Sequence, residues 1–402
     1  MTEAAERGFR YGHPDWCNLG QGAPETGMLP GCAPRLTHID LDAASSEYAP
    51  VAGIGELREA VAELYNARHR RGMPTRYSAE NVAIAAGGRT SLTRLATALG
   101  NVNLGHLLPD YTAYEELLEV FRAFVPIPIV LREREGFYLD PASLRDEIVG
   151  SGLGALLLSN PCNPTGRLVA GDDLAAWVAT ARELGCALIL DEFYAHYLYA
   201  DDAPTSVSAC AYVEDVDVDP VVVVDGLTKN WRYPGLRLSW TVGPKSVIER
   251  VGSAGSFLDG GAPHCLQRAA LPLVDVALAD QEARAIQRAF ASKRSLMLGR
   301  LSELGIGVVG GASAGGPEGA FYCFADLRHL PDTLADGMAF FARALERQVI
   351  CVPGSFFDVD PGKRRGHIPS RLAGFVRLSF GPEREQVERG LDRIAAMVAE
   401  AR

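Results

Sequence analysis

The chain has 402 residues, of which 48% are hydrophobic and 22% are charged, so it can bury a large core and is long enough for two domains. Its formal net charge of -11 disfavours nucleic acid and anionic membranes as partners, because both require a basic surface. No apolar run approaches the roughly 18 residues that span a bilayer. The cysteines and histidines are scattered and show no metal-ligand spacing, so we expect no metal site. We expect a cytoplasmic protein that acts on small molecules.

Strands and helices alternate through most of the chain. After an irregular stretch, residues 1–45, an amphipathic helix is predicted over 56–68. The predicted elements that follow are strand 81–86, helix 88–99, strand 104–108, helix 115–124, strand 128–131, helix 141–148, strand 156–158, helix 174–184, strands 187–190, 221–224 and 238–242, and helix 246–251. Because the strands are continuous apolar runs, they indicate a parallel sheet with helices on both faces.

The C-terminal part has a different character. A long helical stretch from about 265 to 304 leads into it. Its predicted elements are strands 320–324, 349–352 and 375–380 and helices 334–347 and 382–400. We therefore expect a large α/β domain over 46–300 and a smaller α+β domain over 301–402, with residues 1–45 as an N-terminal arm that forms part of the small domain.

One lysine stands just beyond an apolar strand. Lys229 follows the run Val221–Val224, and the Asn, Pro and Gly residues after it prevent a regular helix. A lysine amine that is positioned in this way can form a Schiff base with a carbonyl compound. Most lysines are solvated, so this interpretation depends on what lies around Lys229.

Other candidate residues also follow predicted strands. They are Gly88, Asn163, Asp191 and Tyr194. In parallel sheets, ligands bind at the carboxyl ends of the strands, so one crevice could collect these residues together with Lys229. The turn Gly87-Gly88 opens a predicted helix, whose free N–H groups and positive dipole end suit a phosphate.

A G-x-S-x-G pattern at 311–315 raises the possibility of a serine hydrolase. A hydrolase elbow needs a strand before the serine and a helix directly after it. Here Gly316-Pro317 follows, which starts no helix and favours a loop. The chain also contains no G-x-G-x-x-G, P-loop or H-E-x-x-H pattern, which disfavours dinucleotide, P-loop and zinc-protease sites.

Four motifs together carry a family resemblance. They are Asn163-Pro164-Thr165-Gly166, Asp191-x-x-Tyr194, Lys229 with Arg237, and Arg377. Their order resembles the fold-type I pyridoxal-phosphate enzymes, specifically the class I/II aminotransferase family. The resemblance implies an aspartate aminotransferase-like fold, with a mostly parallel seven-stranded sheet in the large domain. It also implies pyridoxal 5'-phosphate as cofactor, an α-amino acid as substrate, and a homodimer with shared active sites.

The resemblance assigns the catalytic roles. Lys229 would hold the cofactor as a Schiff base and move the α-proton of the substrate. Asp191 would pair with the pyridinium nitrogen of the cofactor. Tyr194 and Asn163 would hydrogen-bond the phenolic oxygen of the ring. Arg377 would clamp the α-carboxylate of the substrate, because a planar guanidinium suits bidentate binding.

The resemblance also assigns the remaining contacts. The other cofactor-binding positions are Gly87, Gly88, Arg89, Thr228 and Arg237. Tyr111 would stack on the cofactor ring, and Tyr48 would reach the phosphate in the neighbouring subunit. Gly22 would let the backbone approach the substrate carboxylate, where Asn163 also contributes.

Three segments depart from the family pattern or remain open. Gly226 occupies a position that is commonly serine, and the loop 259–263 lacks the usual Ser or Thr, which would leave room for a larger substrate. Lys363, Arg364 and Arg365 form either a solvated loop or a lid that grips an anionic substrate.

The reaction after removal of the α-proton also remains open at this point. Transamination is the first hypothesis. Elimination or replacement at the β or γ position, or ring formation by a lyase or synthase, is the alternative, because one fold hosts all of these reactions. A cofactor-bearing regulatory domain is a third hypothesis.

Overall fold

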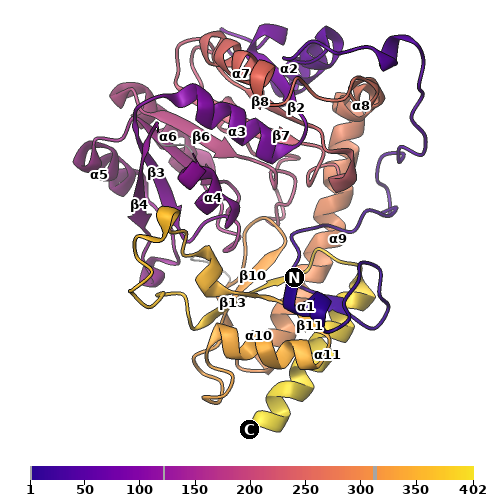
Figure 1. Ribbon diagram of the computed structural model, residues 1–402, viewed down its shortest axis with the longest axis vertical. Coiled ribbons are helices and arrows are strands. Elements are labelled where there is room, and N and C mark those ends of the chain that lie inside the picture. The colour runs from indigo at the N-terminus through magenta and orange to yellow at the C-terminus, as the bar shows by residue number, and fades with distance from the viewer. Residues whose placement is uncertain (1, 121–122, 311–314) are drawn as a thin grey trace.

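Two sheets organise the chain in the computed structural model, which describes residues 2–120, 123–310 and 315–402 (Figure 1). The larger sheet has seven strands in the order β2-β8-β7-β6-β5-β3-β4. They are β2 (Val82–Ala85), β3 (Asn103–Leu108), β4 (Val125–Val130), β5 (Ala155–Ser159), β6 (Ala187–Asp191), β7 (Val221–Gly226) and β8 (Ser239–Val242). Every described pairing in this sheet is parallel except the two made by β8, which confirms the mostly parallel sheet.

Helices cover the larger sheet and surround the smaller one. The described helices are α1 (Thr2–Glu6), α2 (Gly55–His69), α3 (Gly88–Leu99), α4 (Ala113–Val120), α5 (Pro141–Ser151), α6 (Gly171–Leu184), α7 (Lys245–Leu258), α8 (His264–Ala270), α9 (Val276–Glu303), α10 (Gly337–Glu346) and α11 (Arg384–Ala401). On β5, Leu157 packs in the same cluster as Leu92 of α3. Its neighbour Leu156 packs with Leu174 of α6 in another cluster. Successive strand residues thus point to opposite covered faces, which explains the continuous apolar runs.

The smaller sheet is antiparallel and lies below the larger one in Figure 1. Its order is β12-β13-β10-β9, with β9 (Gly307–Val308), β10 (Tyr322–Asp326), β12 (Val352–Pro353) and β13 (Phe375–Ser379). A separate pair joins the two ends of the chain, since β1 (Cys17–Asn18) runs parallel to β11 (Val349–Ile350). The exact division at 45 and 300 stays a prediction.

Several element boundaries differ from the sequence predictions for identifiable reasons. The helical stretch 265–304 is broken by a 3-10 turn, Leu271–Val274, that contains Pro272. A new helix, α9, then begins behind Asp275, whose carboxylate accepts from Ala277 N and Leu278 N, both at 3.0 Å. Because proline cannot donate a backbone hydrogen bond and aspartate is a strong N-cap, the chain restarts its helix here.

The helix predicted over 246–251 is longer than expected. It continues to Leu258 as α7, so residues 256–258, which were predicted as part of a loop, are helical. Gly252 and Gly255 make the sequence pattern of a helix weaker here. The side chain of Arg94 packs closely against Gly255, where a Cβ atom would lie 2.5 Å from the guanidinium carbon. Tertiary packing overrides the low propensity of glycine here.

Other differences are smaller. The helix predicted to end at 124 is described as far as Val120, and residues 123 and 124 are not helical. The strand 349–352 divides between two sheets as β11 and β12. The serine of the G-x-S-x-G pattern and most of that motif, residues 311–314, lie outside the described residues.

Candidate active site

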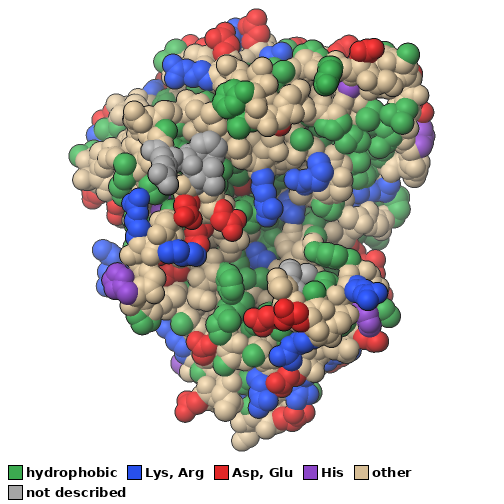
Figure 2. Space-filling model, in the orientation of Figure 1, with side chains coloured by type: hydrophobic (Ala, Val, Ile, Leu, Met, Phe, Trp, Pro, Cys, Tyr) green, Lys and Arg blue, Asp and Glu red, His purple; other side chains and the backbone are tan. Residues whose placement is uncertain are grey.

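A cavity of about 350 Å³ opens at the carboxyl ends of β5, β6 and β7. Figure 2 shows the molecule hollowed between its upper and lower parts, with charged side chains around the hollow. The volume lies within the range of small-molecule sites, roughly 300–1,000 Å³. The predicted residues that line the cavity are Gly22, Gly88, Arg89, Tyr111, Asn163, Asp191, Tyr194, Thr228, Lys229 and Arg237. One crevice therefore collects most of the candidate site.

Lys229 is half-buried in the wall of this cavity. Its Nζ donates a short hydrogen bond to the carbonyl oxygen of Gly22, which belongs to the N-terminal segment. Burial, together with the positive charges of Arg377 and Arg237, lowers the pKa of Lys229 to about 7. The amine is therefore able to exist in its neutral, proton-accepting form close to neutral pH.

Asp191 is the last residue of β6 and is buried. Its Oδ2 accepts from the Tyr114 hydroxyl at 3.0 Å, and its Oδ1 accepts from Phe193 N at 3.4 Å. Burial raises the pKa of Asp191 to about 6, although the Tyr114 hydrogen bond opposes this rise. A buried carboxylate with few partners is stabilised by a cation, so the site suits a protonated ring nitrogen. The sequence analysis missed Tyr114, which stands three residues after Tyr111 where α4 begins.

Arg377 is held in place from several sides on β13. Its Nη1 donates to Asn163 Oδ1 at 2.7 Å, and its Nη2 donates to the carbonyl oxygen of Gly20. The guanidinium carbon lies 4.2 Å from the ring centre of Tyr322 and 5.0 Å from that of Phe357. Its buried Nε has no hydrogen-bond partner among the described residues. Arg377 does not line the cavity itself but lies behind Asn163, which does.

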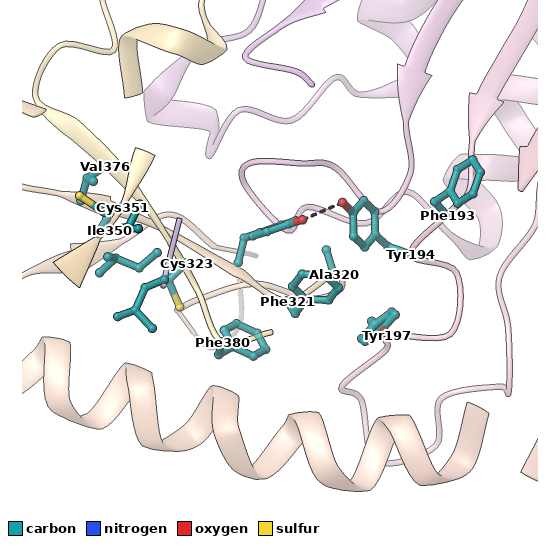
Figure 3. Close-up of a cluster of buried hydrophobic side chains, with 14 of the residues drawn as sticks. Phe193, Tyr194, Tyr197, Ala320, Phe321, Cys323, Ile350, Cys351, Val376 and Phe380 are labelled. Carbon is teal, nitrogen blue, oxygen red and sulfur yellow. Dashed lines mark hydrogen bonds between the residues drawn. The ribbon is translucent and has the colours of Figure 1, made fainter. Parts of the chain in front are cut away.

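The small sheet reaches the cavity through a pair of tyrosines. The hydroxyls of Tyr194 and Tyr322 lie 2.7 Å apart, and Figure 3 shows Tyr194 pointing into a buried cluster with Phe321. Burial raises the pKa of Tyr322 to about 12. A Cβ atom at Gly22 would lie 2.5 Å from the Tyr322 hydroxyl, so this position requires glycine. Tyr322 lies within the predicted strand 320–324, but no local pattern marked it as part of the site.

The turn before α3 has the features of an anion site. Gly87 has a φ of +94°, and a Cβ there would collide with the guanidinium of Arg237. A Cβ at Gly88 would lie 2.6 Å from the Phe193 ring. Gly87 thus lets Arg237 come close to the first turn of α3, and Gly88 lets Phe193 do so. The N-terminal end of a helix offers N–H groups and a positive dipole end that suit an anion. The buried hydroxyl of Thr228 also has no partner among the described residues. These groups fit a phosphate.

The two departures from the family pattern have structural causes. A Cβ at Gly226 would lie 2.5 Å from Ser239 Cα and 2.6 Å from the Leu238 carbonyl oxygen, so β7 and β8 pack too closely there for a serine. Asp259 is engaged by the fully buried Arg94, whose Nε donates to it at 2.8 Å. The loop after α7 is therefore fixed by an ion pair with α3.

The basic loop is largely neutralised within the chain. Lys363 forms an ion pair with Glu115 of α4, and Arg365 pairs with Asp358 at 2.8 Å. Two of the three cations are thus occupied by carboxylates, which argues against a lid that grips an anion with all three. The loop instead connects the C-terminal part to α4.

Tyr48 is the one predicted site residue that lies well away from the cavity. Its side chain is 96% exposed. Within one chain it therefore contacts no part of the cavity.

Asp110 is an important residue that the sequence analysis did not identify. It is fully buried and accepts hydrogen bonds from the Ser159 hydroxyl and from Tyr111 N, the latter at 2.7 Å. The Ser159 hydroxyl in turn accepts from Asn163 N at 3.0 Å. Burial raises the pKa of Asp110 to about 8. One carboxyl group thus fixes both Tyr111 and the Asn163 loop. Like Asp191, Asp110 follows an apolar strand, and this position could have identified it from the sequence.

Residues 2–120, 123–310 and 315–402 contain neither a candidate metal site nor a candidate membrane-spanning helix. No group of three or more His, Cys, Asp or Glu within them could hold a metal ion. No helix in the same ranges is long and apolar enough to cross a bilayer.

Comparisons with known proteins agree with this geometry. The family described as aminotransferase class I and II matches residues 14–394. The aspartate/prephenate aminotransferase of Thermus thermophilus is 30% identical over 368 residues, covering 89% of this chain and 84% of the relative. The valine–pyruvate aminotransferase of Mycobacterium tuberculosis is 28% identical over 401 residues, covering 98% and 93% of the two chains.

Solved structures of such enzymes share the fold. Aspartate aminotransferase from Thermus thermophilus with maleate has a TM-score of 0.78 at 26% identity, covering 98% of this chain and 94% of that one. An aminotransferase from Mycobacterium tuberculosis has a TM-score of 0.79 at 26% identity, covering 99% and 95%. Because the family match extends over almost the whole sequence and the fold recurs in these enzymes, the chain belongs to the aminotransferase class I and II family, which is pyridoxal-phosphate-dependent.

Proposed function

We propose that this chain transfers the amino group of an α-amino acid to a keto acid, with Lys229 as the group that moves the α-proton. Family membership confirms the aminotransferase class predicted from the motifs. The reported relatives are named aminotransferases, which favours transamination over elimination, replacement or ring formation. The observation that carries the residue assignment is the half-buried amine of Lys229, whose pKa is lowered to about 7 in the same cavity as Asp191.

The cavity residues suit pyridoxal phosphate as the cofactor. The first turn of α3 at Gly88, with Arg237 and Thr228, would take its phosphate, since the guanidinium of Arg237 lies against Gly87 and the buried hydroxyl of Thr228 has no partner among the described residues. Asp191 would hold the ring nitrogen, and Tyr111 would lie against the ring. When bound, the cofactor supplies an electron-withdrawing ring that makes the α C–H of an amino acid acidic.

The protein groups would orient the substrate and move its proton. Arg377 would bind the α-carboxylate from its place behind Asn163, and the carboxylate would then replace Asn163 Oδ1 as the acceptor for Nη1. The neutral amine of Lys229 would accept the proton from the α-carbon, and the protonated amine would then be the acid that gives it back. The low pKa of this lysine brings both forms within reach near neutral pH.

We also propose that two copies of the chain form a dimer with shared active sites. Exposed apolar side chains are found on the N-terminal segment, at Ile39, Leu41 and Tyr48, and at Phe257 near the end of α7. Figure 2 shows hydrophobic side chains gathered over α8 and the adjoining N-terminal segment. Such a patch on a chain of this size is typical of an interface, and Tyr48 would reach the partner's cavity from it.

Absorption spectroscopy tests the assignment of Lys229. With pyridoxal phosphate, the wild-type protein should show a visible band that survives gel filtration, and Lys229→Ala should lose it. Lys245→Ala, at a lysine exposed on α7, is the matched control and should keep the band. A band unchanged in Lys229→Ala would show that another amine holds the cofactor.

Product analysis tests the reaction class. Without a keto acid acceptor, a suitable amino acid should bleach the band and release one equivalent of its keto acid. Adding an acceptor should restore the band. Release of ammonia in place of reversible bleaching would contradict transamination and support elimination.

A further inference from the structure

A second cavity of about 640 Å³ lies beside the first, between α4 and the loop that follows β12. It is lined by Arg89, Thr112, Ala113, Glu115, Glu116, Met338, Ser355, Phe356, Asp358, Asp360, Lys363, Arg365, Gly366, Ile368, Pro369, Ser370 and Arg371. Arg89 lines both cavities. The two cavities are therefore adjacent at Arg89.

Three exposed apolar side chains line this second cavity. Met338 of α10 is 44% exposed, and Phe356 and Ile368 of the C-terminal loop are each 56% exposed. Single exposed apolar residues are normal on a protein surface, but three that line one hollow mark a place for an apolar ligand. No assigned role of the aminotransferase site uses them.

The charges of the second cavity balance. Its lining holds the acids Glu115, Glu116, Asp358 and Asp360 and the bases Arg89, Lys363, Arg365 and Arg371. Lys363 is paired with Glu115, and Arg365 lies 2.8 Å from Asp358 and 3.6 Å from Asp360. An ionised ligand group would lose hydration here and meet no net opposite charge. The ligand that fits is uncharged.

We propose that the second cavity is a subsite for the substrate side chain, and that it takes a long, uncharged, largely apolar group of an α-amino acid. This inference rests on the proposed function, because the first cavity must hold the α-amino and α-carboxylate groups. Relatives are named for aspartate, prephenate or valine, and none of these is a long straight-chain apolar amino acid.

A chain-length series tests the subsite. The substrates are straight-chain 2-amino acids from 2-aminobutyrate to 2-aminodecanoate, with aspartate for comparison. Once the chain passes Arg89, kcat/KM should rise about three- to fourfold per methylene, because each buried CH₂ contributes about 0.8 kcal/mol. A series that is flat or falls with length, or a preference for aspartate, overturns the proposal.

Variants locate the effect in the second cavity. Ile368→Asp and Met338→Asp should each lower kcat/KM for 2-aminodecanoate by about tenfold or more, and change that for 2-aminobutyrate by less than about twofold. Val149→Asp is the matched control, since Val149 is 64% exposed on α5, outside both cavities. Equal losses for short and long substrates in either folded variant, or the same loss in the control, overturn the assignment.

A binding measurement separates failure of the subsite from failure of the proposed function. Straight-chain carboxylates from butanoate to decanoate cannot be transaminated, so calorimetric titration reports binding alone. Their dissociation constants should fall with length in the wild-type protein and not in Ile368→Asp. If no amino acid is turned over but this length dependence is present, the proposed reaction fails and the subsite stands. If amino acids are turned over without any length dependence, the subsite fails alone.

Discussion

Lys229 is half-buried and Asp110 is fully buried, and burial favours the neutral form of each. The pKa of Lys229 falls to about 7, whereas that of Asp110 rises to about 8. Because both groups are charged near neutral pH in the unfolded chain, each makes folding less favourable over a defined pH range. Stability measurements on single variants can therefore detect both groups.

Replacing Lys229 should stabilise the cofactor-free protein. Between about pH 7 and 10.5 the unfolded chain binds a proton at Lys229 that the folded chain does not, so wild-type stability rises with pH across this range. Lys229→Met should remove that rise and be more stable by about 3–5 kcal/mol at pH 7. Urea unfolding at pH 7, 8, 9 and 10 measures the difference, which should shrink as the pH increases. A constant difference would show that the amine is not perturbed.

Asp110 should show the opposite pH dependence. Between about pH 4 and 8 the folded chain keeps a proton on this carboxyl group that the unfolded chain has lost, so its contribution to stability falls as the pH rises. Asp110→Asn should abolish this fall and keep the contact with Ser159. Asp110→Ala should cost about 1–3 kcal/mol, because it leaves buried donors without an acceptor. Urea unfolding at pH 5, 6, 7 and 8 checks both variants, and parallel pH profiles for wild type and Asp110→Asn would contradict the assignment.

The sequence identified those site residues that follow apolar strands. Asp191, Asn163 and Lys229 were predicted because each stands where a strand of a parallel sheet ends, and the structure brings them into one cavity. Tyr114 and Tyr322 were missed because their importance comes from contacts with residues far along the chain, at Asp191 and Tyr194. No local pattern encodes such contacts.

Among the secondary-structure elements, the packing of β7 against β8 explains why Gly226 stands where the family commonly has serine. Gly226 would leave a bound cofactor phosphate without a serine hydroxyl, but the close approach of Ser239 and Leu238 leaves no room for a side chain. The glycine is thus required by the contact between two strands. The orphaned hydroxyl of Thr228 remains available nearby.

Restoring the family serine should therefore be harmful. Gly226→Ser should destabilise the protein by about 1–3 kcal/mol, because an added side chain in a packed core forces strands apart. Thermal unfolding measures the loss, and cofactor titration should show no gain in affinity. Gly235→Ser, at a glycine with open space around it, is the matched control and should leave stability nearly unchanged. A tighter complex with pyridoxal phosphate in Gly226→Ser would contradict this interpretation.

Element type was easier to predict than element ends. Six of the seven strands of the larger sheet are buried on both faces, which makes each a largely apolar run, whereas the edge strand β4 is partly exposed. The break before α9 and the extension of α7 depend on a proline turn, an aspartate cap and packing against Arg94. These boundary features involve too few residues to disturb the periodic pattern of a helix.

For the whole molecule, the two sheets were predicted separately, and their meeting around one cavity was implied by the family resemblance alone. Composition and periodicity contain no information on how the small sheet places Arg377 behind Asn163. The dimer, in which Tyr48 would serve the partner, also follows from the resemblance. The side chain of Tyr48 is highly exposed in a single chain, as a contact with a partner chain requires.

Cofactor affinity should depend on association of two chains. Tyr48→Phe should raise the dissociation constant for pyridoxal phosphate by about tenfold, since a hydrogen bond to a charged group contributes roughly 1.5–3 kcal/mol. Tyr11→Phe, at another exposed tyrosine, is the control. Sedimentation should show a dimer in both variants. A monomeric wild-type protein that binds the cofactor tightly would contradict the shared site.

The pairing of β1 with β11 has a consequence for the order of events during synthesis. The N-terminal segment brings the Gly20 and Gly22 carbonyls to Arg377 and Lys229, yet its strand partner is made only when the chain is almost finished. Domains generally fold as units from the N-terminus as they leave the ribosome. The large sheet can therefore fold first, whereas the cavity is complete only when both ends of the chain are present. We therefore expect the complete cavity to form only when synthesis of the chain is nearly finished.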